Sequence, residues 1–554
     1  MTGQEGIFIY DTTLREGDQS MTGGVLTAAD MIDIATKLDK FGVPFIEAPW
    51  PLPEEELEEE EEKLAWEKVM LFYQKVKEKE FADKVFVFGS TMEKDVEAKD
   101  SPRLKALIKT GLKNFAIFGK TSKRHVQEVL KTTLKENLRM IEESVKHLKR
   151  RGGLVFFDAE HFFDGWLEDR DYAAKVLLTA KNAGADAIIL CDTNGGMLTW
   201  QISEIIQEAL PELKDIGWGV HLHNDGDLAL ANTIFAINLG AKYAQVAVNG
   251  DSERVGMPKL TSLLPTLMLK MGIKCEGITK IKGLKALAEY VAEKHNDWLP
   301  PNQPFVGANA FTHKAGTHRA GAEIDPTLQE HIPPDLVGAK RRFPISGIAG
   351  PNGIMKGLKE EGLKLNEEDE AVKKFAKKVL QIVKKKDEHG YHLESAPASF
   401  AMLAFRMQDD YQWPFKLTYI EPKSILTCTI DGWIWEHSSS CLVEVNIPSE
   451  QKPIRVWNDG SDGPVHAIEN AIKPTLAKIF PILNEIELVN YRVRILKYNG
   501  KKGTASKVRV SITGATPFGT ADTVGVHENI LLASAQALMD LFEWTIQRSV
   551  GKLR

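Results

Sequence analysis

The stretch NAGADAIILCD at residues 182–192 joins a glycine-containing helix ending to a nearly continuous apolar run. A run without polar alternation is typical of a parallel strand that helices cover on both faces. Further runs of this kind, several of them also preceded by a glycine-containing helix ending, occur before residue 250. They are IFIY (7–10), PFIEA (44–48), KVFVFG (84–89), NFAIF (114–118), LVFFD (154–158), WGVHLH (218–223) and QVAV (245–248).

Eight strand–helix units within roughly 270 residues predict an α/β fold of the (β/α)8 TIM-barrel type. In such a barrel the catalytic groups sit at the carboxyl ends of the strands. A doubly wound parallel sheet is the alternative, but the chain has no glycine-rich turn of the kind that binds dinucleotides.

The chain has 554 residues, and its sequence changes character twice after the predicted strands. We expect the barrel in residues 1–285, a linker with small helical subdomains in 286–395, and an α+β domain in 396–554. The last part reads as a pseudo-repeat of β-β-α units. Glycine-rich turns at 459–464 and 519–525 are predicted to open its amphipathic helices. Their backbone N–H groups could hold a small carboxylate, or the glycines could serve plain turn geometry.

Composition narrows the function classes. Lys and Arg total 70 against 77 Asp and Glu, a net charge of −7, which argues against a nucleic-acid binder. No apolar run approaches the roughly 18 residues of a membrane helix, and the N-terminal residues lack the pattern of a secretion signal. Four scattered cysteines do not make a disulfide framework. We therefore expect the protein in the reducing cytoplasm.

Residues that follow the first predicted strand and residues that end the seventh form a candidate metal site. His221 and His223 flank Leu222 at the end of the seventh strand, so both imidazoles point to one face. Asp11, or Glu16 shortly after it, supplies a carboxylate beyond the first strand. Because barrel closure brings strands 1, 7 and 8 together, these side chains predict a divalent-metal site with open positions. A histidine pair without a metal is the alternative.

These residues belong to longer motifs that resemble one enzyme family. The motifs are DTTLREGDQ (11–19), FIEAPWP (45–51), FGSTM (88–92), FGKTSKRHVQEVLKTTLKENL (118–138), DAEHFFDGW (158–166), LCDTNGG (190–196), HLHND (221–225), SERVG (252–256), FVGANAFTHKAGTHRAG (305–321), NDGSDGPVHAIENA (458–471) and GTADTVGVHENI (519–530). Together they are similar to the isopropylmalate/homocitrate synthase family, TIM-barrel metalloenzymes that perform Claisen condensations. The likeness covers essentially the whole chain.

The resemblance implies a role for particular residues. The metal ligands would be Glu16, His221 and His223, with Asp11 beside them at the barrel mouth. The catalytic residues would be Arg15, Glu160 and His318, and Arg15 and Thr193 would bind the 2-oxo acid. A salt bridge for Arg15, a structural hydrogen bond for Glu160, a helix cap for Thr193 and an exposed loop position for His318 are the alternatives.

The resemblance also implies cofactors and partners. The ion would be Mg²⁺, Mn²⁺ or Zn²⁺, and the substrates acetyl-CoA and a 2-oxo acid, with pyruvate favoured. His318 would reach a neighbouring barrel, which implies at least a homodimer. An amino-acid end product, isoleucine first and leucine second, would bind in the C-terminal allosteric domain. The candidate effector residues there are Asp459, Gly460, Gly463 and Gly525.

Three places depart from the family pattern: Met257, Gln329 and the early segment GDQSMTGG (17–24), where the family usually reads GTQGEG. Met257 stands where the family usually has Asn near the metal, and Gln329 stands where related enzymes have Tyr. Three hypotheses follow: condensation of acetyl-CoA with pyruvate in isoleucine biosynthesis; condensation with a larger acid such as 2-oxoisovalerate or 2-oxoglutarate; or a catalytically weakened regulatory paralogue.

Overall fold

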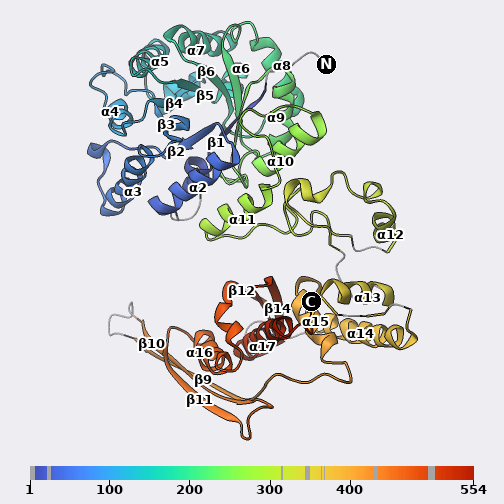
Figure 1. The fold of residues 1–554 in the computed structure, drawn as a ribbon. Helices are drawn as coiled ribbons and strands as arrows, with labels where there is room; N and C mark the ends of the chain where they lie inside the picture. Colours follow the sequence, from blue (N-terminus) through green and yellow to red (C-terminus); the bar gives the residue numbers. More distant parts are fainter. Residues whose placement is uncertain are drawn as a thin grey trace. The chain divides into compact units, whose positions relative to one another are not determined.

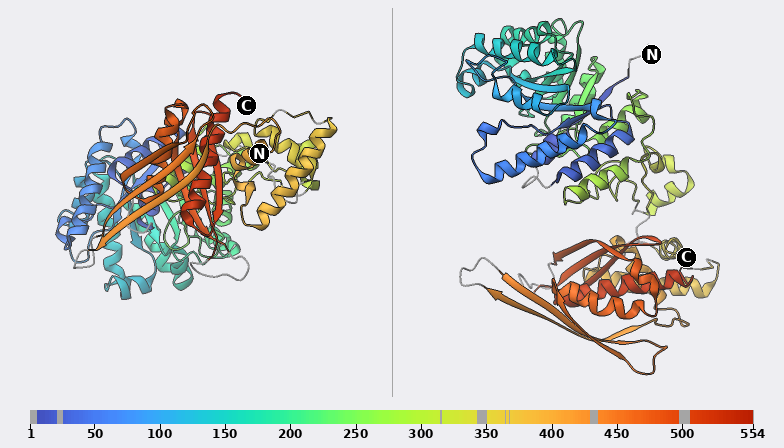
Figure 2. Two further views of the ribbon diagram at one scale, coloured as in Figure 1. Left: turned by 90° about the horizontal axis from the view of Figure 1, so that it is seen from below. Right: turned by 60° about the vertical axis from the view of Figure 1, so that its left-hand side comes forward.

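The structure is a computed structural model that describes residues 6–20, 26–313, 316–342, 350–363, 365–366, 368–428, 435–496 and 506–553. The chain forms two compact units (Figures 1 and 2). The first runs to Phe311 and includes His331–Lys340, and the second comprises Thr312–Glu330 and the chain from Arg341 onward. The domain boundaries at residues 285 and 395 stay predictions.

A closed barrel of eight parallel strands forms the centre of the first unit (Figure 1). β1 pairs with β2 on one side and with β8 on the other, where Phe8 is opposite Tyr243. This pairing closes the sheet, which confirms the TIM barrel and excludes the doubly wound alternative. The strands are β1 (Phe8–Asp11), β2 (Phe45–Ala48), β3 (Val85–Ser90), β4 (Asn114–Lys120), β5 (Val155–Glu160), β6 (Ala187–Asp192), β7 (Gly217–Leu222) and β8 (Tyr243–Val246).

Helices surround these strands and bury their apolar faces against the sheet (Figure 1). Two of the glycine-containing endings, at Gly42 (φ 97°) and Gly184 (φ 99°), end their helices in the left-handed conformation that glycine adopts without a steric penalty. The helices are α1 (Asp18–Ser20), α2 (Ala28–Phe41), α3 (Glu60–Val76), α4 (Pro102–Lys109), α5 (Leu134–Lys149), α6 (Phe162–Glu168), α7 (Arg170–Ala183), α8 (Thr199–Ala209), α9 (Ala229–Asn238), α10 (Leu260–Pro265) and α11 (Leu284–Lys294).

Two layers of side chains fill the barrel interior. The lower layer is aromatic; the ring centroids of Phe156 and Tyr243, for example, are 4.9 Å apart. Residues i and i+2 of a strand share a face, so the next inward position on each strand lies one layer higher. The upper layer is polar there, with Asp158 two residues after Phe156 and Gln245 two residues after Tyr243. The barrel thus places buried polar groups on an apolar floor, near its carboxyl end.

The second unit combines short helices with two antiparallel sheets (Figure 2). Its helices are α12 (Gly316–Ile324), α13 (Pro351–Glu360), α14 (Glu370–Glu388), α15 (Pro397–Phe405), α16 (Pro464–Ala477) and α17 (Ile530–Ser549). One sheet has the order β11-β10-β9 and packs on α16; the other has the order β12-β13-β14 and packs on α17. The strands are β9 (Lys416–Cys428), β10 (Trp435–Asn446), β11 (Ile454–Ser461), β12 (Glu487–Ile495), β13 (Val508–Thr516) and β14 (Gly519–His527).

The C-terminal α+β domain is confirmed, but two local predictions about it are wrong. Each repeat is β-β-β-α, because β9 and β12 precede the strands that were predicted. β12 lies at a sheet edge with most of its side chains exposed, which weakens its apolar pattern. Residues 519–525 form the start of β14 and not a turn, and α17 begins only at Ile530, after an Asn529 cap.

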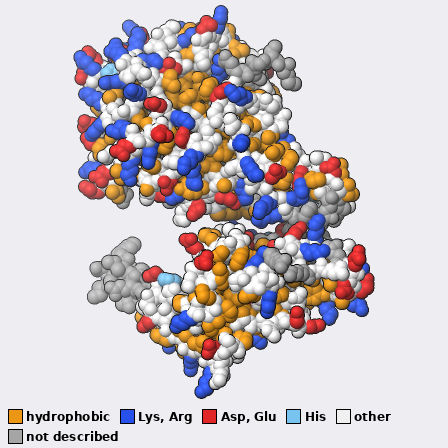
Figure 3. Space-filling view, in the orientation of Figure 1, with side chains coloured by type: hydrophobic (Ala, Val, Ile, Leu, Met, Phe, Trp, Pro, Cys, Tyr) orange, Lys and Arg blue, Asp and Glu red, His pale blue; other side chains and the backbone are white. Residues whose placement is uncertain are grey.

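The surface carries charges of both signs. Lys, Arg, Asp and Glu side chains intermingle over the face of the barrel unit that Figure 3 shows. That the chain does not bind nucleic acid stays a prediction. Across the part of the chain that the structure describes, every helix is too short or too polar to cross a membrane.

Candidate metal centre

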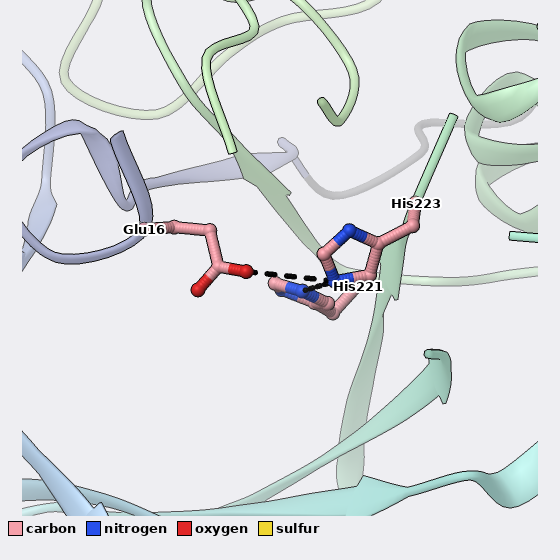
Figure 4. Close-up of side chains that lie close together, drawn as sticks. All are labelled: Glu16, His221 and His223. Atoms are coloured by element: carbon pink, nitrogen blue, oxygen red, sulfur yellow. Dashed lines mark hydrogen bonds and ion pairs between the residues drawn. The ribbon is translucent and has the colours of Figure 1, made fainter. Parts of the chain in front are cut away.

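Glu16, His221 and His223 come together at the mouth of the barrel (Figure 4). All three are buried, and their ligand atoms lie within 4.8 Å of one another. The Nε2 atoms of the two histidines are 3.2 Å apart, and Nε2 of His223 is 3.5 Å from Oε1 of Glu16. The structure therefore juxtaposes the three side chains that the sequence analysis selected.

A π-helical turn, η1 (Thr13–Gly17), carries Glu16 directly after β1. Asp11 fixes the start of this turn, because its carboxylate accepts hydrogen bonds from the backbone N–H of Thr13 (3.0 Å) and from the Thr13 hydroxyl (3.1 Å). Burial raises the pKa of Asp11 to about 7. Asp11 thus holds the loop, and Glu16 is the carboxylate that faces the histidines.

The donor set fits a divalent ion. Burial, followed by the neighbouring His223, lowers the pKa of His221 well below its ordinary value. Burial, followed by Arg254, lowers the pKa of His223 to about 4. Both imidazoles are therefore neutral at physiological pH, which is the form that donates a lone pair to a metal. The Ser252 hydroxyl donates to Oε1 of Glu16 at 3.0 Å and orients this carboxylate.

Arg15 lies between two buried carboxylates. Its Nε atom is 2.6 Å from Oε1 of Glu47, and its guanidinium group also forms an ion pair with Glu16. The guanidinium carbon stands 3.8 Å from the ring centroid of Phe88. The hydroxyl of Tyr10 donates to the other oxygen of Glu47 at 2.8 Å. Arg15 is thus a fixed positive charge next to the candidate metal ligands.

Glu160 and Thr193 lie on the strand ends of the same barrel. Glu160 ends β5 and forms a 2.5 Å ion pair with Lys120, its register partner on β4. The Thr193 hydroxyl follows β6 and accepts a hydrogen bond from the backbone N–H of His161 at 2.8 Å. Thr193 is not a helix cap, because α8 begins after Leu198. The roles of Glu160 and Thr193 in catalysis stay predictions.

His318 belongs to the second unit. Its side chain is exposed on α12, which is the alternative to a catalytic role that the sequence left open. Gln329 follows a short 3-10 helix (Pro326–Leu328) in the same unit. The catalytic role of His318 stays a prediction.

Met257 occupies a buried position beside the turn that carries Glu16. Its sulfur accepts a hydrogen bond from the hydroxyl of Thr12, the residue before η1, at 3.0 Å. Only 1% of Met257 is exposed. Met257 is therefore accommodated by its contact with Thr12, and the cluster of Glu16, His221 and His223 forms beside it.

The sequence analysis missed Glu47, Asp158 and Gln245. Each is a polar residue inside a nearly apolar strand, and each is buried. Burial and the nearby Glu47 carboxylate raise the pKa of Asp158 well above its ordinary value. A buried polar group inside a barrel strand needs a partner, and that requirement was the available signal.

Comparison with protein families defines the class. The HMGL-like family matches residues 6–289, which contain the barrel and the whole candidate metal centre. The homocitrate synthase post-HMGL domain-like family matches residues 305–387, and the LeuA allosteric (dimerisation) domain matches residues 420–545. The chain is thus an acyltransferase of the condensing class with a C-terminal regulatory domain.

Individual relatives narrow the class further. An (R)-citramalate synthase from Aquifex aeolicus (strain VF5) is 37% identical over 98% of both chains. Another from Streptomyces coelicolor is also 37% identical, over 98% of this chain and 97% of its own. A 2-isopropylmalate synthase from Sulfurisphaera tokodaii is 33% identical over 69% of this chain and 91% of its own. The chain belongs to the (R)-citramalate synthase family.

Proposed function

We propose that this enzyme condenses acetyl-CoA with pyruvate and water to give (R)-citramalate and free CoA. The observation that carries the proposal is the near-complete coverage of (R)-citramalate synthases, combined with a buried Glu-His-His cluster at the barrel mouth. The product, (R)-citramalate, would then be a precursor in isoleucine biosynthesis.

Glu16, His221 and His223 would hold the divalent ion. A substrate that chelates through oxygens suits Mg²⁺ or Mn²⁺, and two imidazoles also allow Zn²⁺. When bound, the ion supplies Lewis acidity toward the keto group of the 2-oxo acid.

Arg15 and Thr193 would position the 2-oxo acid. The guanidinium group of Arg15, fixed by Glu47, offers hydrogen bonds and positive charge to the keto oxygen, where negative charge develops during attack. The Thr193 hydroxyl lies at the end of β6 and would donate to the substrate carboxylate. It can do so while it accepts from His161, because a hydroxyl both donates and accepts.

Glu160 and His318 would move the protons. A base formed by these residues removes one proton from the acetyl methyl group, and the resulting enolate forms the new carbon–carbon bond to the keto carbon of pyruvate. The keto oxygen takes a proton and becomes the tertiary hydroxyl. Water then cleaves the thioester, so that the acyl carbon becomes a carboxylate and CoA leaves as the thiol.

Assembly and control would come from the second unit. The match to an allosteric dimerisation domain supports a homodimer with an amino-acid effector, isoleucine before leucine. Gly463 is the residue before α16 and stays a candidate effector residue. Asp459 and Gly460 stay candidates too, but they lie at the end of β11 and not in the predicted turn. Gly525 is a weaker candidate, because it lies within the β14 ladder opposite Val510. A cytoplasmic location stays a prediction.

Release of CoA with a panel of 2-oxo acids tests the substrate. We expect the highest kcat/KM with pyruvate, and (R)-citramalate as the product in chiral chromatography. A higher kcat/KM with 2-oxoisovalerate or 2-oxoglutarate would favour a sibling activity instead. Release with none of the acids by protein that binds metal would favour the weakened paralogue.

A further inference from the structure

Gln245 lies between a candidate metal ligand and a buried acid. It sits on β8, next to β7, which carries His221, and none of its side chain is exposed. Its Oε1 atom is 2.6 Å from Nδ1 of His221. Its Nε2 atom is 3.4 Å from Oδ1 of Asp158, on β5 across the barrel. The carboxamide thus connects His221 of the candidate metal centre to Asp158, its neighbour in the polar layer.

We infer that Gln245 is a positioning residue that fixes the tautomer and orientation of His221, so that Nε2 faces the metal. This inference rests on the proposed metal site. It concerns a residue that contacts no substrate and acts only through His221.

The direction of the two hydrogen bonds carries the argument. A carboxamide has one end that accepts and one end that donates. In the structure Nε2 of Gln245 faces Oδ1 of Asp158, and an amide nitrogen only donates, so this carboxyl oxygen accepts the hydrogen bond. The accepting end therefore faces His221, and Nδ1 of His221 must carry the hydrogen.

A neutral imidazole with hydrogen on Nδ1 has its lone pair on Nε2. In His221 this is the atom that lies 3.2 Å from Nε2 of His223, inside the Glu-His-His cluster. The hydrogen bond to Gln245 also restrains rotation of the ring. Partners of this kind commonly change metal affinity 10- to 100-fold when they are removed.

Gln303 provides a matched comparison within the same unit. It too is buried, and its Nε2 atom donates to Asn249 (3.2 Å) and Thr261 (3.1 Å), neither of which is in the cluster. Gln303→Leu therefore removes the same side chain from a similar environment. A purely structural role for a buried amide predicts the same outcome for both substitutions.

The experiment compares Gln245→Leu, Gln245→Glu and Gln303→Leu in the full chain. Mn²⁺ binding is measured by titration calorimetry on metal-free protein, together with the melting temperature. We expect about 10- to 100-fold weaker Mn²⁺ binding for Gln245→Leu. We expect Gln245→Glu to restore affinity to within a few-fold, because a carboxylate still accepts from Nδ1, and Gln303→Leu to bind like the wild type.

The tautomer gives a second readout that needs no metal. Long-range ¹H–¹⁵N correlation spectra of metal-free protein with ¹⁵N-labelled histidine should show His221 with hydrogen on Nδ1. The Gln245→Leu spectrum should show a mixture of tautomers, and His221→Ala assigns the signal. Hydrogen on Nε2 in the wild type, or equal Mn²⁺ affinity in wild type and Gln245→Leu, overturns the inference. Failure of the wild type to bind Mn²⁺ overturns the proposed metal site instead.

Discussion

The Nε atom of Arg15 lies 2.6 Å from Oε1 of Glu47, and both side chains are buried at the barrel mouth. The same guanidinium group is paired with Glu16, the carboxylate of the candidate metal centre. One cation therefore connects the ligand cluster to the barrel interior. Without the Glu47 charge, Arg15 would pair more strongly with Glu16 and compete with the metal for this carboxylate.

Replacement of Glu47 by Gln tests this relationship. The amide keeps the shape and can still accept from Arg15, but it removes one of the two negative charges that share the guanidinium group. We expect kcat/KM for the 2-oxo acid to fall at least about ten-fold and the protein to lose up to about 3 kcal/mol of stability. Steady-state kinetics and thermal unfolding measure both effects.

Glu136→Gln is the control for this substitution. Glu136 also pairs with an arginine of the barrel unit, Arg139 at 2.5 Å, but on the outer helix α5. Its kcat/KM should stay at the wild-type value. Wild-type kinetics in Glu47→Gln would mean that Arg15 keeps its position without this carboxylate.

Metal removal tests the cluster directly. EDTA should abolish CoA release, and Mn²⁺ should restore it in the wild type. His221→Ala should lose about 100-fold or more in kcat and regain little with Mn²⁺, because one of three protein ligands is missing. His147→Ala, at the outer end of α5, should behave like the wild type. A fully active metal-free preparation would contradict the proposal.

Met257→Asn tests the departure from the family pattern. A thioether is a poor ligand for a hard divalent ion, whereas an amide oxygen at this position can face the metal. The Thr12 hydroxyl can donate to the new amide as it does to the sulfur. We expect Mn²⁺ affinity to rise about ten-fold, as measured by calorimetry. Met257→Leu should leave the affinity unchanged; weaker binding in this variant would show that the sulfur itself is a ligand.

The barrel and the position of its candidate metal site were predictable for a physical reason. Every barrel strand is covered on both faces, so its apolar run is nearly unbroken. Closure of eight such strands brings the ends of β1 and β7 together, which predicts that a carboxylate after β1, Asp11 or Glu16, lies beside His221 and His223. The choice of Glu16 came from the resemblance to the family.

The residues that support this set were harder to predict. Gln245 and Asp158 interrupt apolar runs in a way that sequence alone does not separate from exposed positions. Only the structure shows that Gln245 contacts His221 and that Asp158 contacts the other end of Gln245. For Gly525, by contrast, the sequence pattern led to a wrong prediction. It looked like a turn glycine, but the reason for it is packing against a helix.

Gly525 allows β14 and α17 to pack closely against each other. A Cβ atom on Gly525 would lie 1.9 Å from the backbone oxygen of Ala533, so β14 and α17 could not keep their present distance. We expect Gly525→Ala to cost about 1–3 kcal/mol of stability in the second unit. Because an effector must distinguish two states of the enzyme, a displaced α17 should also weaken inhibition by the proposed effector, isoleucine. Mn²⁺ affinity of the barrel should not change. Gly350→Ala is the control, since an added methyl group there meets no atom within 4 Å. Thermal unfolding and inhibition curves of the full chain measure both effects, and undiminished inhibition in a destabilised Gly525→Ala protein would place the effector site outside this helix–sheet contact.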